Sequence, residues 1–227
     1  AQRLGMKSSR CGTSNGWPDE GRTQVTARDL ATLAVNTIRD YPDLYRKFYQ
    51  QKEFSWGKTM GNGENIVQAN RNPILGRIQG ADGLKTGHTE EAGYGFTGSA
   101  EQNGRRLVMV VAGLGSFHDR ISESVKFMDW GFKAWATKPI FAKGAEIEKA
   151  KVSGGNATKV ALVAPQAINV TYPAGFAAPK YSYKVRYNGE IKAPIKAGQH
   201  IADLVVTTAD TPPAVVPLVA GKDVEEA

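Results

Sequence analysis

The feature that most restricts the fold is a change in sequence pattern near residue 137. Before it, two long segments have helical periodicity, and all four tryptophans lie at or before residue 135. After it, short segments with a period of two are separated by Gly, Pro and Asn. Several short strands at regular spacing are typical of a small β-sandwich or barrel. We therefore expect an α+β chain with two domains, residues 1–137 and residues 138–227.

The first helical segment, VTARDLATLAVNTIRDYP, covers residues 25–42. Thr26 is a good N-cap residue, Asp29 stands at capping-box spacing from it, and Pro42 ends the segment. The apolar residues that fall on one face are Leu30, Leu33, Ala34 and Ile38.

A hairpin and a second helix are expected next. The apolar runs GYGFTGSA and RRLVMVVAGL flank Asn103-Gly104, which is a strong two-residue turn signal. Residues 116–136 then have helical periodicity, with Ser116 and Asp119 at capping-box spacing. The face expected against the sheet consists of Ile121, Val125, Met128, Phe132 and Trp135.

Period-two segments predict the remaining strands. One lies before the hairpin, in KEFSWGKTM at residues 52–60. Those of the second domain are expected at 159–165, 167–173, 181–187, 190–195 and 201–208, with a tight turn at 187–190. The polar tail, residues 220–227, is expected to be loose.

Composition excludes several functional classes. The net charge of +7 is not concentrated in a basic block, and no nucleic-acid-binding motif is present. The single Cys11 cannot form an intrachain disulfide, and the three histidines are far apart, so we expect no structural metal. No apolar run approaches the ~18 residues of a membrane span. Residues 1–4 are not followed by the apolar stretch of a signal peptide, so for an exported protein we expect that segment to have been removed or to lie upstream.

The residues that suggest chemistry are Lys85, Thr86, Gly87 and His88. On an edge strand, lysine offers a positive charge and threonine offers a hydroxyl, while a bare glycine lets a peptide pair with the strand. The next backbone N–H, that of His88, could face a developing oxyanion. Lys-Thr-Gly is one of three signatures of serine β-lactamases and penicillin-binding proteins. By itself it equally describes a turn-to-strand junction with a solvated lysine.

Four longer segments carry a resemblance, and they occur in family order over nearly the whole chain. DGLKTGHTEEAGYGFTGSA, TSNGWPDEGRTQVTARDLATLA, DRISESVKFMDWGF and EIKAPIKAGQHIADLVV resemble parts of the D-alanyl-D-alanine carboxypeptidases. These are the low-molecular-mass penicillin-binding proteins of the S11 serine peptidase family. The resemblance implies part of a β-lactamase/transpeptidase-like domain, an antiparallel sheet with helices, followed by an all-β sandwich.

The resemblance also implies roles for individual residues. Lys85, Thr86 and Gly87 match the catalytic Lys-Thr-Gly strand, and the backbone N–H of His88 would be half of the oxyanion hole. Arg120 matches the arginine that, with Thr86, binds the terminal carboxylate of the substrate. Without the resemblance, Arg120 would be read as a surface charge in the first turn of a helix.

The family's Ser-x-x-Lys and Ser-x-Asn motifs are not recognised in this sequence. Ser55-Trp56-Gly57-Lys58 has the first spacing, but glycine is unfavourable in a helix and the segment reads as a strand and a turn. Thr13-Ser14-Asn15 aligns with a different family segment. We expect an upstream segment to supply the nucleophile. This chain alone should then be inactive, expose an apolar patch and aggregate.

The resemblance implies a serine-type enzyme that cleaves the terminal D-Ala from peptidoglycan stem pentapeptides through an acyl-enzyme and is acylated by β-lactams. It implies no metal and no organic cofactor. It places the protein in the periplasm or extracytoplasmic envelope, and it allows peripheral inner-membrane association through a segment not present here. Two alternatives stay open. One is a non-catalytic wall-binding or scaffolding relative, and the other is a β-lactamase or transpeptidase.

Overall fold

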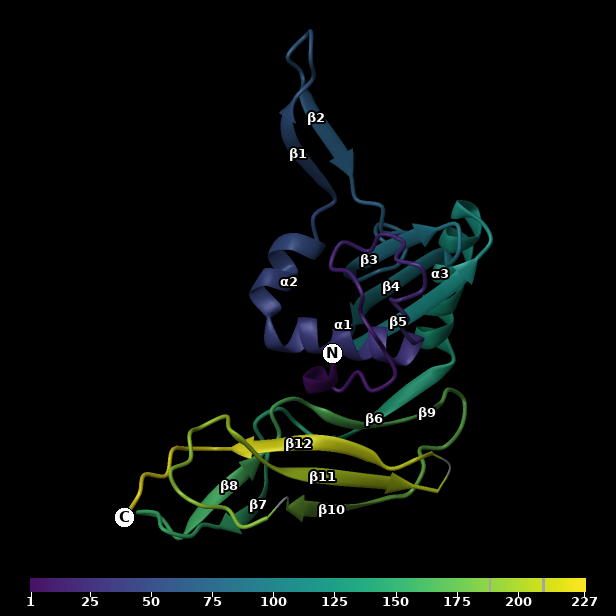
Figure 1. The fold of residues 1–227 in the computed structure, drawn as a ribbon. Coiled ribbons are helices and arrows are strands. Elements are labelled where there is room, and N and C mark those ends of the chain that lie inside the picture. Colours follow the sequence, from purple (N-terminus) through teal and green to yellow (C-terminus); the bar gives the residue numbers. More distant parts are fainter. Residues whose placement is uncertain (188, 210) are drawn as a thin grey trace. The chain divides into compact units, whose positions relative to one another are not determined.

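A computed structural model of the chain describes residues 1–187, 189–209 and 211–227. The chain divides into two compact units, Ala1–Lys133 and Ala134–Ala227. The first unit mixes helices with antiparallel strands, and the second is built from strands (Figure 1).

The first unit begins with a short 3-10 helix and two α-helices, and it ends with a third α-helix. These helices are η1 (Gln2–Leu4), α1 (Ala27–Asp40), α2 (Pro42–Tyr49) and α3 (Phe117–Lys133). Its strands are β1 (Glu53–Lys58), β2 (Asn65–Ala69), β3 (Ala81–Thr89), β4 (Gly93–Gln102) and β5 (Arg105–Leu114). β1 and β2 form a two-stranded hairpin, and the other strands form a three-stranded sheet in the order β3-β4-β5.

The helix starts follow their predicted caps. The hydroxyl of Thr26 accepts a hydrogen bond from the backbone N–H of Asp29 at 3.1 Å. The hydroxyl of Ser116 accepts one from the N–H of Asp119 at 3.0 Å and donates to its carboxylate at 2.8 Å. Both side chains satisfy amides that a helix start leaves without partners.

The predicted hairpin between β4 and β5 is confirmed. Gln102 pairs with Arg105, which leaves a two-residue loop. Its two residues, Asn103 and Gly104, both have positive φ, at 51° and 74°. This is the backbone twist that a type I′ turn requires, and Asn-Gly adopts it at low steric cost.

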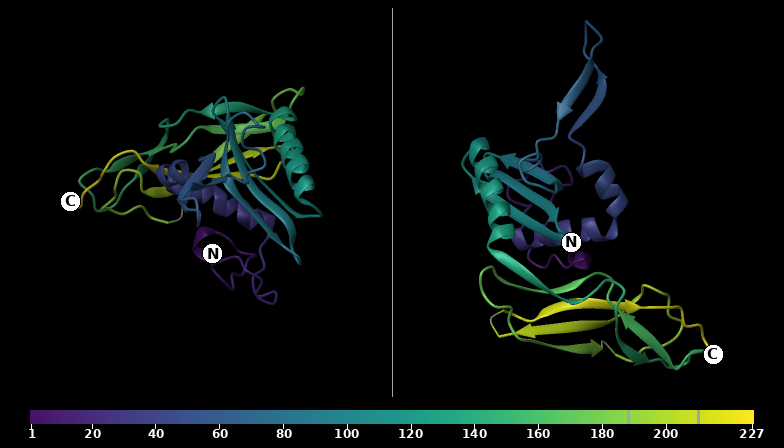
Figure 2. Two further views of the ribbon diagram at one scale, coloured as in Figure 1. Left: turned by 90° about the horizontal axis from the view of Figure 1, so that it is seen from above. Right: turned by 180° about the vertical axis from the view of Figure 1, so that it is seen from behind.

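α3 and α1 lie on opposite faces of the three-stranded sheet (Figure 2). On the α3 side, the buried core consists of Ile74, Phe96, Ala100, Met109 and Met128. Val125 and Phe132 of α3 pack against it, as their periodicity predicts. Trp135 was expected on the same helical face, and this was wrong. α3 ends at Lys133, and Trp135 begins a strand that pairs with another strand of the second unit.

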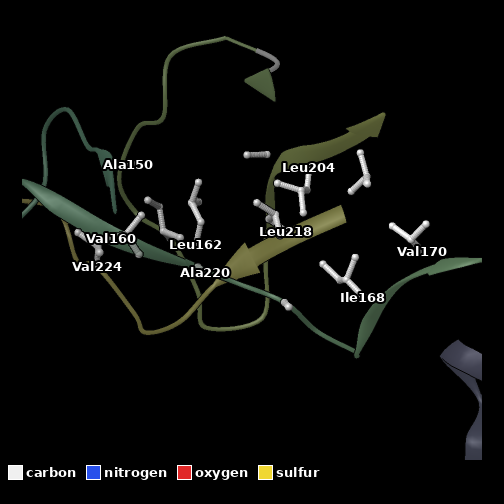
Figure 3. Packing of buried hydrophobic residues seen from close by; sticks show 13 residues of the cluster. Ala150, Val160, Leu162, Ile168, Val170, Leu204, Leu218, Ala220 and Val224 are labelled. Atoms are coloured by element: carbon white, nitrogen blue, oxygen red, sulfur yellow. The ribbon is translucent and has the colours of Figure 1, made fainter. Parts of the chain in front are cut away.

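The described part of the second unit contains seven strands. They are β6 (Trp135–Phe141), β7 (Glu146–Lys151), β8 (Lys159–Val163), β9 (Ile168–Pro173), β10 (Tyr181–Tyr187), β11 (His200–Thr208) and β12 (Ala214–Ala220). Five form a sheet in the order β10-β11-β12-β8-β7, and β6 pairs with β9. Because β9 supplies Ile168 and Val170 to the core under the larger sheet, the two sheets share one core (Figure 3). Shared burial between two sheets is the arrangement of a sandwich.

In the second unit, two predictions are wrong and a third falls partly outside the described residues. The predicted strand at 190–195 was wrong, because among the described residues this segment makes only isolated bridges, Ser153 with Lys192 and Ile195 with Val224. The tail was also expected to be loose, whereas Val224 is fully buried in the core. The predicted turn at 187–190 includes Asn188, which lies outside the described residues.

Candidate active site

The Lys-Thr-Gly segment lies on β3, whose only sheet neighbour in the described chain is β4. One edge of β3 is therefore unpaired. Lys85, Gly87 and His88 are exposed along it, and Thr86 is half-buried. An unpaired strand edge offers backbone N–H and C=O groups to an incoming extended peptide.

Two glycines of β3 differ sharply in their surroundings. A Cβ added at Gly87 would meet no atom within 4 Å. A Cβ added at Gly83 would lie 2.3 Å from the hydroxyl oxygen of Tyr45. Gly83 is therefore required by packing inside the unit, whereas the space beside Gly87 is open to a ligand.

Arg120 reaches the same strand from the first turn of α3. Its side chain is buried, with 4% of the residue exposed, and its Nη1 donates to the carbonyl oxygen of Gly87 at 3.3 Å. The guanidinium carbon lies 5.1 Å from the ring centre of Phe117 and 5.3 Å from that of Tyr94. The alternative of an ordinary surface charge does not describe this residue.

The charge on Arg120 is incompletely compensated within the described chain. Its Nε is buried and has no hydrogen-bond partner among the described residues. Burial lowers the pKa of the guanidinium, and the positive charge of Arg71 acts in the same direction. A buried donor without an acceptor is costly, so the guanidinium keeps one hydrogen-bond donor that the described chain leaves unsatisfied.

The remaining site residues lie beside Gly87. Nζ of Lys85 donates to the carbonyl oxygen of Thr86 at 2.6 Å. The ring of His88 stacks on Tyr94, with the ring centres 3.9 Å apart. Tyr94 thus contacts both His88 and Arg120.

A cleft of about 590 Å³ lies between this strand and α1. Residues 84–89 of β3 form one side, and Leu30, Leu33 and Ala34 of α1 contribute to the other. A concave, mostly apolar site with a few polar groups on one side is typical of a small-molecule or peptide site.

Sequence reasoning missed a polar network behind β3. The hydroxyl of Tyr45 donates to Oδ1 of Asp82 at 2.6 Å, and Nη1 of Arg106 donates to the same oxygen at 2.9 Å and to the hydroxyl of Ser99 at 2.7 Å. Burial and the bond to Asp82 raise the pKa of the Tyr45 hydroxyl. The network fixes the start of β3 three residues before Lys85. Spacing could not reveal it, because Tyr45, Asp82 and Arg106 come from separate elements.

The two segments with motif-like spacing, residues 55–58 and 13–15, do not line the cleft. Ser55 and Lys58 lie on the exposed strand β1, so the serine does not begin a helix. Neither Ser14 nor Asn15 lines the cleft, although the neighbouring Gly16 does. Among the described residues, no helix is long and apolar enough to cross a membrane, and no cluster of three or more potential ligands could hold a metal ion.

Two family models match this chain, and each falls within one of the two compact units. Residues 1–116 match the family model described as D-alanyl-D-alanine carboxypeptidase, and residues 135–226 match the C-terminal domain of penicillin-binding protein 5. The chain is 35% identical over 209 residues to the D-alanyl-D-alanine carboxypeptidase DacA of Haemophilus influenzae, covering 90% of this chain and 50% of that protein. It spans about half the length of the curated relatives it matches.

Solved structures extend the comparison. Penicillin-binding protein 5 from Haemophilus influenzae gives a TM-score of 0.65 at 32% identity, covering 99% of this chain and 63% of that one. Penicillin-binding protein D2 from Listeria monocytogenes, in its ampicillin-bound form, gives 0.50 at 34% identity, covering 58% and 52%. The expected fold class, α+β with a β-lactamase-like part and a β domain, is confirmed. With a family model matched over residues 1–116 of 227, the chain belongs to the D-alanyl-D-alanine carboxypeptidase family of S11 peptidases.

Proposed function

We propose that this chain forms the substrate-recognition part of a serine-type D-Ala-D-Ala carboxypeptidase that acts on peptidoglycan stem peptides. The observation that carries the proposal is the buried Arg120 beside the open edge at Gly87. An extended peptide ending in a carboxylate suits this combination, because its backbone pairs with the edge strand while its terminal charge meets a guanidinium.

The site residues divide the recognition between them. The D-Ala-D-Ala end of the stem peptide lies along β3 and passes over Gly87, where no side chain obstructs it. Arg120 and the hydroxyl of Thr86 bind the terminal carboxylate, and Lys85 adds positive charge. The backbone N–H of His88 stabilises the oxyanion that forms as the peptide carbonyl is attacked.

The chemistry proceeds through an acyl-enzyme. A serine hydroxyl attacks the carbonyl carbon of the penultimate D-Ala, and its proton passes to a base. The C–N bond to the terminal D-Ala then breaks as a proton is delivered to the departing amine. The terminal D-Ala leaves as the free amino acid, and water then hydrolyses the serine ester. The serine is supplied by a Ser-x-x-Lys helix outside these 227 residues, because the one such spacing within them lies on β1.

β-Lactams are expected to acylate the same serine. The Listeria monocytogenes neighbour has ampicillin bound, which supports the same ligand class for this protein. Since peptidoglycan is the substrate, the proposed compartment is the periplasm or extracytoplasmic envelope. A non-catalytic wall-binding relative is the second candidate, and the observation that favours it is the lack of a helix-borne Ser-x-x-Lys in the described chain.

The test uses the full-length protein, produced from the complete reading frame, and a free stem pentapeptide ending in D-Ala-D-Ala. The proposal predicts release of one D-Ala per peptide, abolished in Lys85→Ala. If the folded full-length protein binds peptidoglycan but releases no D-Ala, the non-catalytic candidate is correct.

A further inference from the structure

The β1–β2 hairpin extends away from the rest of the first unit (Figures 1 and 2). Every residue of β1 is exposed, and in β2 only Ile66 is partly buried. In the described structure no third strand joins this sheet. A two-stranded hairpin gains little stability by itself, so one that exposes large apolar side chains on both strands is suited to contact a ligand.

One face of the hairpin carries two aromatic rings. Phe54 pairs across the hairpin with Gln68, and Trp56 pairs with Ile66, so these four side chains share a face that we call the aromatic face. Phe54 is 59% exposed and Trp56 is 50% exposed. Neither ring stacks on another aromatic ring in the described chain. Ser55 and Val67 point to the opposite face.

The base of the hairpin is fixed next to the candidate active site. The N–H of Asn70 donates to the carbonyl oxygen of Lys52 at 2.8 Å, which closes the two strands. Nδ2 of the buried Asn72 donates to the carbonyl oxygen of Gly83 at 3.0 Å. Gly83 precedes Lys85 on β3 by two residues. The hairpin is therefore anchored to the strand on which the substrate peptide is proposed to lie.

The dimensions of the aromatic face limit what it can bind. Six residues span about 20 Å and two strands about 10 Å, so the face offers roughly 200 Å². A stable protein interface buries about 800 Å² on each partner. A second copy or a globular partner would thus gain too little from this face alone, whereas a narrow polymer would cover it completely.

Charge and side-chain chemistry further limit the class of ligand that the aromatic face can bind. Residues 52–69 hold two lysines, Lys52 and Lys58, against two glutamates, Glu53 and Glu64. A neutral hairpin has no polybasic character, which anionic lipid surfaces and nucleic acids require. Aromatic rings beside an amide suit a saccharide, whose C–H faces pack on the rings while its hydroxyls form hydrogen bonds.

We propose that the aromatic face binds the glycan strand of peptidoglycan, with saccharide rings packed on Phe54 and Trp56 and hydroxyl groups bonded to Gln68. This inference rests on the proposed function, since the stem peptide that enters the site is attached to that glycan. The hairpin then holds the polymer while one of its peptides lies on β3.

The experiment measures sedimentation of the full-length protein with insoluble glycan from which an amidase has removed all stem peptides. Phe54→Ala and Trp56→Ala should each raise the dissociation constant roughly tenfold. Val67→Ala, on the opposite face, is the matched control and should leave it within about twofold. Equal melting temperatures for the three variants exclude unfolding as the cause.

The inference is overturned if Phe54→Ala and Trp56→Ala bind glycan as the unmodified protein does. It is also overturned if Trp56→Ala instead abolishes a dimer, or abolishes binding to anionic lipid vesicles. Covalent labelling of the unmodified protein by a fluorescent penicillin separates this result from the proposed function. Labelling without glycan binding rejects the hairpin site alone, and glycan binding without labelling rejects the proposed catalysis alone.

Discussion

Nη1 of Arg120 donates to the carbonyl oxygen of Gly87 at 3.3 Å, so the first turn of α3 is joined directly to the exposed edge strand. This contact brings a buried guanidinium to the point where the strand is open to a peptide.

Replacing Arg120 should separate carboxylate recognition from folding. Arg120→Ala in the full-length protein should lower kcat/KM for a D-Ala-D-Ala peptide roughly 100-fold, because a charge-assisted bond to the carboxylate is lost. Arg120→Lys retains the charge without the guanidinium fork and should recover only part of the loss. Peptide hydrolysis and melting temperature are measured for each. An unchanged kcat/KM in a folded Arg120→Ala variant would contradict the assignment.

The two glycines of β3 should respond in opposite ways. Gly87→Ala places a methyl group in open space, so stability should change by no more than about 0.5 kcal/mol. The same methyl group obstructs the approaching peptide, and kcat/KM should fall roughly 100-fold.

Gly83→Ala is the matched substitution. Its Cβ would lie 2.3 Å from the Tyr45 hydroxyl oxygen, so the variant should lose about 1–3 kcal/mol of stability. For both variants, denaturant unfolding measures stability and peptide hydrolysis measures kcat/KM. A destabilised Gly87→Ala or a fully stable Gly83→Ala would show that the two environments are assigned incorrectly.

The network behind β3 should contribute to stability. Tyr45→Phe removes the hydroxyl that donates to Asp82 at 2.6 Å and leaves Arg106 as its partner. The expected cost is about 1 kcal/mol, which corresponds to a melting temperature lower by about 2–4 °C. Tyr49→Phe, a tyrosine of the same helix, is the comparison. Equal melting temperatures for Tyr45→Phe and the unmodified protein would argue against a role for this bond.

In the second unit, Asp203 should make stability depend on acid pH. The hydrogen bond from Arg186, together with the contact to His200, holds the pKa of the buried Asp203 carboxyl below its usual value. The stabilisation is therefore present above the unfolded pKa of about 3.9 and is lost as pH falls through the lower folded pKa.

Asp203→Asn should be less stable than the unmodified chain at pH 7, and this difference should shrink toward pH 3. Glu226→Gln, which removes an exposed carboxylate of the second unit, controls for the loss of one negative charge. Thermal unfolding of the second unit, followed across this pH range, measures the stability difference between the variant and the unmodified chain. A stability difference that stays constant with pH would contradict the proposed linkage.

Local chemistry in the sequence predicted several elements. Thr26 and Ser116 cap helices as their spacing indicated, and Asn103-Gly104 forms the predicted two-residue turn. Local signals failed where tertiary packing decides the outcome. The segment 190–195 has strand periodicity but makes only isolated bridges, and the polar tail is held because Val224 fills the core.

At the candidate site, too, local signals predicted some residues, and tertiary packing determined the arrangement of others. The Lys-Thr-Gly motif, together with the family resemblance of the segments around it, singled out Lys85, Thr86 and Gly87 as candidates. The burial of Arg120 and the Tyr45–Asp82–Arg106 network depend on residues far apart in the chain. No periodicity or spacing indicates such a network, and only the fold brings these side chains together.

Covalent labelling by a fluorescent penicillin tests the central claim most directly. The unmodified full-length protein should become labelled, and Lys85→Ala, at an exposed position of β3 where the fold tolerates substitution, should lose the label while keeping its melting temperature. Undiminished labelling of the Lys85→Ala variant would contradict the claim that this edge of β3 is where the substrate binds.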